Sequence, residues 1–150
     1  MSLARKGRRI GCDYGDVRIG LAISDVDGIL ASPFATLLTN SPDLWPQFQS
    51  IVEEYSPIEI YVGRPIHLAG HDSDSTRKAA DFAQQISERF EVKVSMVDER
   101  LSTVSAQRQL KESGVSSRNS KEFIDQAAAV AILELALETE KALQGSNLGK

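Results

Sequence analysis

The segment RIGCDYGDVRIGLAIS, residues 9–24, decides the fold of this chain. It predicts a strand of apolar and small residues, a tight turn at Gly15–Val17 and a second strand, since Gly and Asp are residues that relieve strain in turns. Asp13 is the exception in the first strand, because it places a carboxylate near the end of an apolar run. Burying a carboxylate is costly unless a metal ion, a cation or hydrogen-bond donors pair with it. The partners of Asp13 should therefore come from elsewhere in the chain.

The second strand, residues 18–24, carries apolar or small residues on both of its faces. We therefore expect helices to cover both faces of the sheet. A turn at 25–28 leads into a third strand at about 29–38, which Pro33 interrupts. Proline cannot donate to a strand ladder, so this strand is expected at the edge of the sheet. The three strands form an antiparallel meander.

Helices and strands then alternate along the chain. Periodicity and turn residues predict a helix ending at Ser56-Pro57, a strand at 58–63, a helix at 74–90, a strand at 92–97, a helix at 102–113 and a last helix at 120–142, followed by a frayed end. A meander followed by β-α units is the plan of the ribonuclease H-like fold. We therefore predict an α/β fold with a five-stranded mixed sheet, strand order 3-2-1-4-5 and helices on both faces. This order places the third strand at the edge, in agreement with Pro33.

Composition excludes several classes of protein. The 150 residues predict a single domain, 1–150, with an ordered core at about 8–142. A net charge of −4 is not the basic footprint of a typical nucleic-acid binder, so such binding would need local basic patches or metal ions. The single cysteine, Cys12, is expected to be a buried, inert thiol. No secretory signal or apolar run of membrane-spanning length is present, so we expect a cytoplasmic protein without membrane contact.

Asp125 is a second carboxylate in an apolar setting. It shares one face of the last predicted helix with Ala128, Ala129 and Ile132, a face that should pack on the sheet. The helix dipole favours a negative charge only within the first turn. If Asn119 caps this helix, Asp125 lies beyond that turn, so the dipole does not explain its position. Asp125 is therefore a candidate partner in the site of Asp13.

Asp98 and Glu99 supply a third acidic position, at the end of the fifth predicted strand. Adjacent strand residues face opposite ways, so one of the two should point into the site, and the pattern does not say which. Three carboxylates from two strands and a helix suit Mg²⁺ or Mn²⁺, which prefer oxygen ligands. Two such ions can activate a water and stabilise the leaving oxygen in phosphodiester cleavage. They would also offset the acidic charge of the site.

Four motifs occur in order along the chain and carry a resemblance to a known family. They are Gly11-x-Asp13-Tyr-Gly15-x-x-Arg18-Ile-Gly20-x-Ala22-x-Ser24-Asp25, Val62-Gly63-x-Pro65, Asp98-Glu-Arg-Leu-Ser-Thr103 and Ile124-Asp-Gln-Ala-Ala128 with Ile132-Leu133. Over about residues 8–137 the chain resembles the YqgF family of bacterial proteins, also called RuvX, described both as Holliday junction resolvases and as the pre-16S rRNA nuclease. Arg64 departs from the aliphatic residue that the family often has at that position.

The resemblance implies a ribonuclease H-like, divalent-metal nuclease that matures the 5′ end of the small-subunit ribosomal RNA. It carries the catalytic and metal-binding roles onto Asp13, Glu99 and Asp125, and favours Glu99 over Asp98. The metal would be Mg²⁺ or Mn²⁺, as two ions. Candidates for phosphate contacts are the basic residues near the expected site, Arg18, Arg64, Lys78 and Arg100.

Three alternatives stay open at this point. Structured RNA, such as the small-subunit precursor, and branched DNA are both open as substrates, since contacts to the 2′-hydroxyl cannot be placed from sequence. A phosphate-loop ATPase shares this sheet topology, and a non-catalytic RNA or ribosome-assembly binding protein could use the same fold. A junction resolvase would act as a two-fold homodimer, whereas an RNA nuclease could be a monomer.

Overall fold

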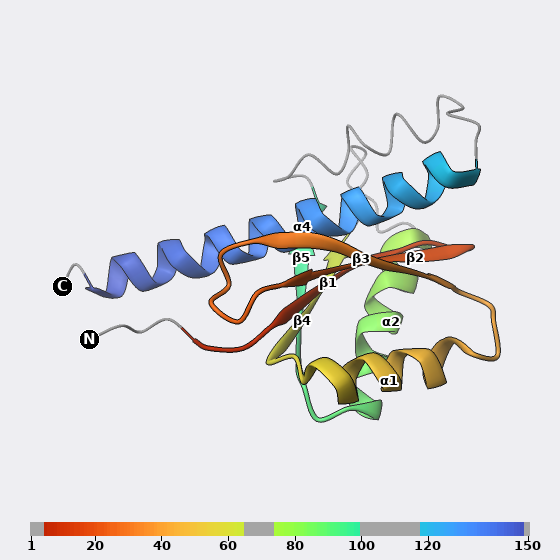
Figure 1. Ribbon diagram of the computed structural model, residues 1–150, viewed down its shortest axis with the longest axis horizontal. Helices are drawn as coiled ribbons and strands as arrows, with labels where there is room; N and C mark the ends of the chain where they lie inside the picture. Colours follow the sequence, from red (N-terminus) through yellow and green to blue (C-terminus); the bar gives the residue numbers. More distant parts are fainter. Residues whose placement is uncertain (1–4, 65–73, 100–117, 149–150) are drawn as a thin grey trace.

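A five-stranded mixed sheet forms the centre of the molecule (Figure 1). The computed structural model describes residues 5–64, 74–99 and 118–148. The strands are β1 (Arg9–Tyr14), β2 (Arg18–Ser24), β3 (Ala31–Leu38), β4 (Glu59–Arg64) and β5 (Lys93–Asp98). Their order is β3-β2-β1-β4-β5, with β1, β2 and β3 antiparallel and β4 and β5 parallel to β1. The predicted fold class and strand order are confirmed.

Helices cover both faces of this sheet. They are α1 (Leu44–Tyr55), α2 (Asp74–Arg89) and α4 (Arg118–Leu148). Figure 1 shows α4 lying along one face and α1 and α2 on the other. The expectation of two covered faces is therefore confirmed, while the helix predicted at 102–113 lies outside the described residues.

The two faces of β1 are packed differently because its side chains alternate. Ile10 and Cys12 point toward α1 and α2, where they join a core built around Phe48 and Phe82. Cys12 is fully buried, and burial, with a smaller contribution from the Asp13 carboxylate, raises the pKa of its thiol. The thiol therefore stays protonated at neutral pH, as expected of an inert cysteine.

Glycines on the other face let α4 approach the backbone of the sheet. A Cβ atom at Gly11 would lie 2.8 Å from the Ala129 carbonyl oxygen, and one at Gly20 would lie 2.1 Å from the Asp125 carbonyl oxygen. Both distances are below van der Waals contact, so no side chain fits at either position. The facing side of α4 is correspondingly small, with Ala128 and Ala129 buried against the sheet. This close approach brings Asp125 to the sheet surface.

The sheet edge and the first helix end follow the sequence signals. β3 is an edge strand, and its pairing with β2 shifts register between Leu21 and Ala22, where Pro33 pairs with Ala22. Helix α1 ends at Ser56, which adopts a left-handed conformation with φ 45°. Its N–H donates to the Val52 carbonyl oxygen at 2.9 Å, which satisfies one of the last carbonyls of the helix.

Helix α4 differs from its prediction at both ends. It begins at Arg118, so Asn119 lies within its first turn and does not cap it, and it continues to Leu148 instead of ending at about 142. The residues from Gly145 onward were expected to fray, but one weak helix former costs only about 1 kcal/mol, which does not end an established helix. In the described parts of the chain, no helix is long and apolar enough to cross a membrane.

Candidate active site

Three acidic side chains are buried on the α4 side of the sheet. Asp13 is 3% exposed, Glu99 5% and Asp125 1%. Asp13 lies near the carboxyl end of β1, Glu99 directly follows β5, and Asp125 lies in the N-terminal third of α4. Since β1, β4 and β5 run parallel, their carboxyl ends lie at the same end of the sheet. Open α/β sheets bind ligands at this end.

Two glycines beside Asp13 make room for the other two acidic residues. Asp13 pairs with Gly20 of β2, and the backbone of Asp125 lies directly over Gly20. On the other side, Cys12 pairs with Val62, so Gly63 of β4 lies next to Asp13. A Cβ atom at Gly63 would lie 2.8 Å from Glu99 Oε1. The structure therefore gathers Asp13, Glu99 and Asp125 around the end of β1.

Glu99, rather than Asp98, takes the buried position. The Glu99 carboxylate lies over Gly63 on the α4 face, whereas Asp98 is half-buried and contributes to a separate cavity between α4 and β5. The strand pattern alone left this choice open, and the family resemblance favoured Glu99. The structure places Glu99 among the buried carboxylates, and its role in catalysis and metal binding stays a prediction.

Arg18 contacts the acidic group directly. Its Nε donates a hydrogen bond of 2.8 Å to Asp125 Oδ2, and the two groups form an ion pair. The Arg18 side chain is 20% exposed, so it also reaches the surface beside the buried carboxylates. Arg18 was predicted to contact phosphate, and the structure adds that it neutralises Asp125.

Two of the other predicted phosphate contacts, Lys78 and Arg64, lie in the described part of the chain. Lys78 Nζ lies 3.0 Å from Asp16 Oδ1 in the turn between β1 and β2. Arg64 is exposed at the end of β4, where it pairs in register with Asp98. Arg100 lies outside the described residues. Phosphate contact by these residues stays a prediction.

The acidic residues match a hard divalent cation in chemistry. Carboxylate oxygens are the ligands that Mg²⁺ and Mn²⁺ prefer, and a buried group of carboxylates favours a bound cation. As the side chains are arranged, however, the described residues contain no group of three or more His, Cys, Asp or Glu that could hold a metal ion. Arg18 Nε already bonds one oxygen of Asp125, Oδ2.

Two contributions to the site were missed at the sequence level. Gly20 and Gly63 were quoted as motif residues, but glycine inside a strand is also a signal of close approach by another group, and here each glycine lies under an acidic residue. Gln126 was also missed. Its Nε2 donates to Thr36 Oγ1 at 2.9 Å. This hydrogen bond links α4, directly after Asp125, to the edge strand β3.

A second group of buried charges lies at the opposite end of the sheet. Glu59 accepts hydrogen bonds from Ser95 at 2.5 Å, from Arg5 at 2.7 Å and from Tyr61 at 3.0 Å. Burial alone would raise the pKa of Glu59, but these hydrogen bonds outweigh it and hold that pKa below its usual value. Burial and the Glu59 charge together raise the pKa of Tyr61 to about 12.

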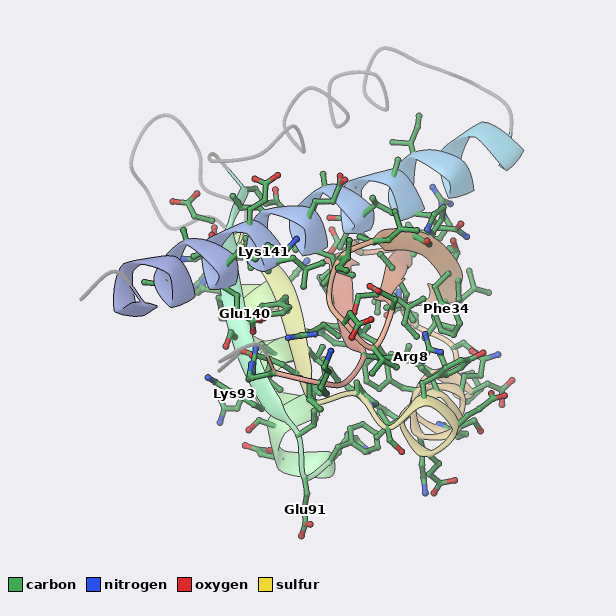
Figure 2. All side chains as sticks on the ribbon, turned by 60° about the vertical axis from the view of Figure 1, so that its left-hand side comes forward. Arg8, Phe34, Glu91, Lys93, Glu140 and Lys141 are labelled. Atoms are coloured by element: carbon green, nitrogen blue, oxygen red, sulfur yellow. The ribbon has the colours of Figure 1, made fainter. Side chains whose placement is uncertain are left out.

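Glu140 connects this group to α4. It accepts hydrogen bonds from Arg9 Nη2 at 2.6 Å and from Arg5 Nε at 2.8 Å. In Figure 2, Glu140 lies at the end of the sheet where Lys93 begins β5. A cavity of about 530 Å³ lies here between α4 and β5, away from Asp13. The charged groups here pair with one another and form a network at the end of the sheet opposite Asp13.

Comparison with known proteins assigns the family. The model of the family described as "RuvX: Holliday junction resolvase" matches residues 7–139. The chain belongs to the RuvX family. Among curated relatives of this family member, a protein of Mycobacteroides abscessus is 46% identical over 91% of this chain and 84% of its own length. One of Rhodococcus opacus is 48% identical over 86% of this chain and 76% of its own length. Both relatives are named "Putative pre-16S rRNA nuclease".

A solved structure supports the fold independently. RuvC of T. thermophilus, in complex with a Holliday junction substrate, superposes with a TM-score of 0.54 and covers 89% of this chain and 96% of its own. The two sequences are 16% identical, so the likeness concerns the arrangement of the helices and strands. Family membership and fold therefore agree with the predicted ribonuclease H-like architecture.

Proposed function

We propose that this protein is a metal-dependent nuclease that hydrolyses phosphodiester bonds in the precursor of the small-subunit ribosomal RNA. The observation that carries the proposal is the gathering of Asp13, Glu99 and Asp125 around the end of β1. Relatives at 46% and 48% identity carry the name of a nuclease acting on pre-16S rRNA, which supports the substrate.

The three carboxylates would hold the divalent ions, with Asp13 in the central position. Bound divalent ions at such a site supply an activated water and stabilise the leaving oxygen of the cleaved bond. The chain itself supplies position, since Asp13 is fixed by the strand ladder and Asp125 by the packing of α4 on Gly20. Rigid placement of catalytic groups contributes much of the rate enhancement, because displacing such a group by 1 Å can lower the rate about 100-fold.

Arg18 has two roles in this proposal. It neutralises Asp125. Its side chain is 20% exposed, so if Asp125 held an ion the guanidinium would be able to pair with a phosphate of the substrate. Arginine suits this second role because its planar donors match phosphate oxygens in pairs.

The test is a cleavage assay with Asp13→Asn. We expect the variant to lose cleavage of a precursor ribosomal RNA fragment in Mg²⁺ or Mn²⁺ by more than about 100-fold while it unfolds like the wild type, because the change removes a ligand charge without changing shape. Asp43→Asn is the matched control, since Asp43 is exposed at the start of α1 and its side chain makes no capping hydrogen bond there. An Asp13→Asn protein that cleaves at the wild-type rate would refute the proposal.

A DNA substrate is the second candidate, because the matching family model carries the name of a Holliday junction resolvase. A four-way DNA junction belongs in the same assay. Paired symmetric nicks would favour this function and would predict a two-fold dimer, whereas cleavage of RNA alone would favour ribosomal RNA maturation. Binding of RNA with no metal-dependent cleavage of either substrate would favour a non-catalytic binding protein.

A further inference from the structure

A cavity of about 260 Å³ lies at the carboxyl end of β1, on the face of the sheet opposite α4. Its lining includes Tyr14 of β1, Trp45 of α1 and Phe82 of α2. Tyr14 directly follows Asp13, and successive strand residues face opposite ways. The cavity and the buried carboxylates therefore lie on the two sides of the same strand end, and Figure 1 shows α1 and α2 on the side away from α4.

The aromatic side chains of this cavity form one connected group. The ring centroids of Tyr14 and Phe82 are 5.0 Å apart, and those of Trp45 and Phe82 are 5.7 Å apart. Phe82 is buried in the core beneath the cavity, and the Arg89 guanidinium lies 4.3 Å from the centroid of the Trp45 ring. The stacking surface for an unpaired base is therefore provided by the partly exposed Tyr14 and Trp45. The volume is slightly below the range of about 300–1,000 Å³ typical of small-molecule sites, which favours a single base over a whole nucleotide.

Polar groups complete the lining at positions suited to the edge of a base. Asn40, Asp81 and Gln85 line the same cavity. Asn40 Nδ2 already donates to the Asp16 carbonyl oxygen at 3.1 Å. The Gln85 amide can both donate to and accept from a base edge, and the Asp81 carboxylate can accept from an exocyclic amino group. The lining thus combines stacking surface with hydrogen-bonding groups.

Lys78 also lines the cavity and provides a positive charge beside it. It pairs with Asp16, but the two side chains are 51% and 67% exposed. Exposed ion pairs contribute little to the free energy of folding, so Lys78 can exchange the Asp16 carboxylate for a phosphate group at a small cost in free energy. A strand that enters the cavity with a base can therefore place a phosphate near Lys78.

We propose that this cavity is a nucleobase subsite that takes one unpaired base of a strand whose backbone crosses Asp13. The proposal rests on the proposed nuclease function and adds that the substrate is single-stranded or unpaired near the cleaved bond. Because base preferences at stacking sites follow stacking strength, the larger ring system of adenine is preferred over uracil.

The chain contains its own reporter for this site. Trp45 is the single tryptophan of the sequence, and it lines the cavity. The wild-type protein in EDTA is titrated with labelled oligoadenylate, oligouridylate and an abasic strand of equal length, while tryptophan fluorescence and label anisotropy are recorded. We expect oligoadenylate to quench Trp45 and to bind about tenfold more tightly than the abasic strand, because stacking is lost without a base. Oligouridylate should lie between the two.

Neighbouring glutamines on α2 give a matched pair of variants. Both are exposed, but Gln85 lines the cavity, whereas Gln84 Nε2 donates to Glu88 Oε1 at 2.9 Å. Gln85→Ala should weaken oligoadenylate binding about three- to tenfold, the effect of one lost hydrogen bond, and Gln84→Ala should leave it unchanged. Equal affinities of the two variants, or binding that leaves Trp45 fluorescence unchanged, would overturn the subsite.

The cleavage assay separates this proposal from the proposed function. RNA cleavage by the wild type without quenching of Trp45 would reject the subsite and leave the nuclease function standing. Base-dependent quenching without metal-dependent cleavage would support the subsite and reject the nuclease function. Absence of any nucleic-acid binding by the wild type would reject both.

Discussion

At the scale of single residues, substitution of Gly63 tests whether the position of Glu99 matters for cleavage as well as for packing. A Cβ atom there would lie 2.4 Å from Ile132 Cδ1 and 2.8 Å from Glu99 Oε1, both of them side-chain ends that can move. We therefore expect Gly63→Ala to fold with a loss of about 1–3 kcal/mol, the usual cost of one extra methyl group in a packed site. Because Glu99 must shift, RNA cleavage should fall up to about 100-fold. Thermal unfolding and cleavage rates at a temperature where the variant is folded test this.

Gly20→Ala is the contrasting variant. A Cβ atom at Gly20 meets the backbone of Asp125, which cannot move without displacing α4. Its loss of stability should exceed the roughly 3 kcal/mol limit of ordinary overpacking, so activity would be lost through unfolding. Full activity of a folded Gly63→Ala protein would mean that the position of Glu99 does not matter for the reaction.

Residue patterns in the sequence predicted part of the site and missed the rest. Asp13 and Asp125 were found because each is a charge on an otherwise apolar strand or helix face. Glu99 could not be separated from Asp98, because alternation along a strand gives two faces without saying which is buried. The pairing of Arg18 with Asp125 was not predicted, since it joins residues far apart in the sequence and depends on how α4 lies across β2.

Helix α4 connects the two ends of the sheet at the scale of secondary structure. Asp125 and Glu140 lie about 22 Å apart along its axis. Glu140→Ala would leave the Arg9 guanidinium, 1% exposed, without its carboxylate. Among the described residues, Arg9 Nε already lacks a hydrogen-bond partner. We expect a loss of about 2–4 kcal/mol in urea unfolding, because the remaining charge stays buried.

Glu138→Ala is the control for this prediction. Glu138 lies on the same helix and is exposed, so its removal should change the free energy of unfolding by less than about 0.5 kcal/mol. Similar losses for the two variants would show that Glu140 acts only through helix propensity and does not hold α4 to the N-terminal segment.

Strand and helix boundaries were predictable where local signals decide them. The strands at 9–14 and 18–24 were predicted to within a residue, because turn residues flank them on both sides. The end of α4 was not, because the composition after Gly145 suggests a frayed end while propagation of an existing helix is cooperative. Local signals mark where a helix can stop, but they do not force it to stop there.

The whole molecule has its proposed chemistry at one end of the sheet and a charge network at the other. Glu59 belongs to the network, and its pKa is lowered in the folded protein. A lowered folded pKa means that the unfolded chain binds the proton more readily. The ionised Glu59 therefore stabilises the fold above its unfolded pKa of about 4.3, and this stabilisation is lost as the pH falls through the lower folded pKa.

Glu59→Gln should separate stability from catalysis. At neutral pH we expect it to lower the free energy of unfolding by about 1.5–3 kcal/mol, the worth of hydrogen bonds to a charged group. The difference from wild type should shrink as the pH falls below about 4, where the wild-type carboxylate also becomes neutral. Urea unfolding between about pH 3 and pH 7 measures this, with Glu91→Gln as control, since Glu91 is exposed in the turn before β5 (Figure 2). RNA cleavage at pH 7 should be unchanged in the folded Glu59→Gln protein. A fall in cleavage without a fall in stability would mean that the two ends of the sheet are coupled, and that the network takes part in the reaction.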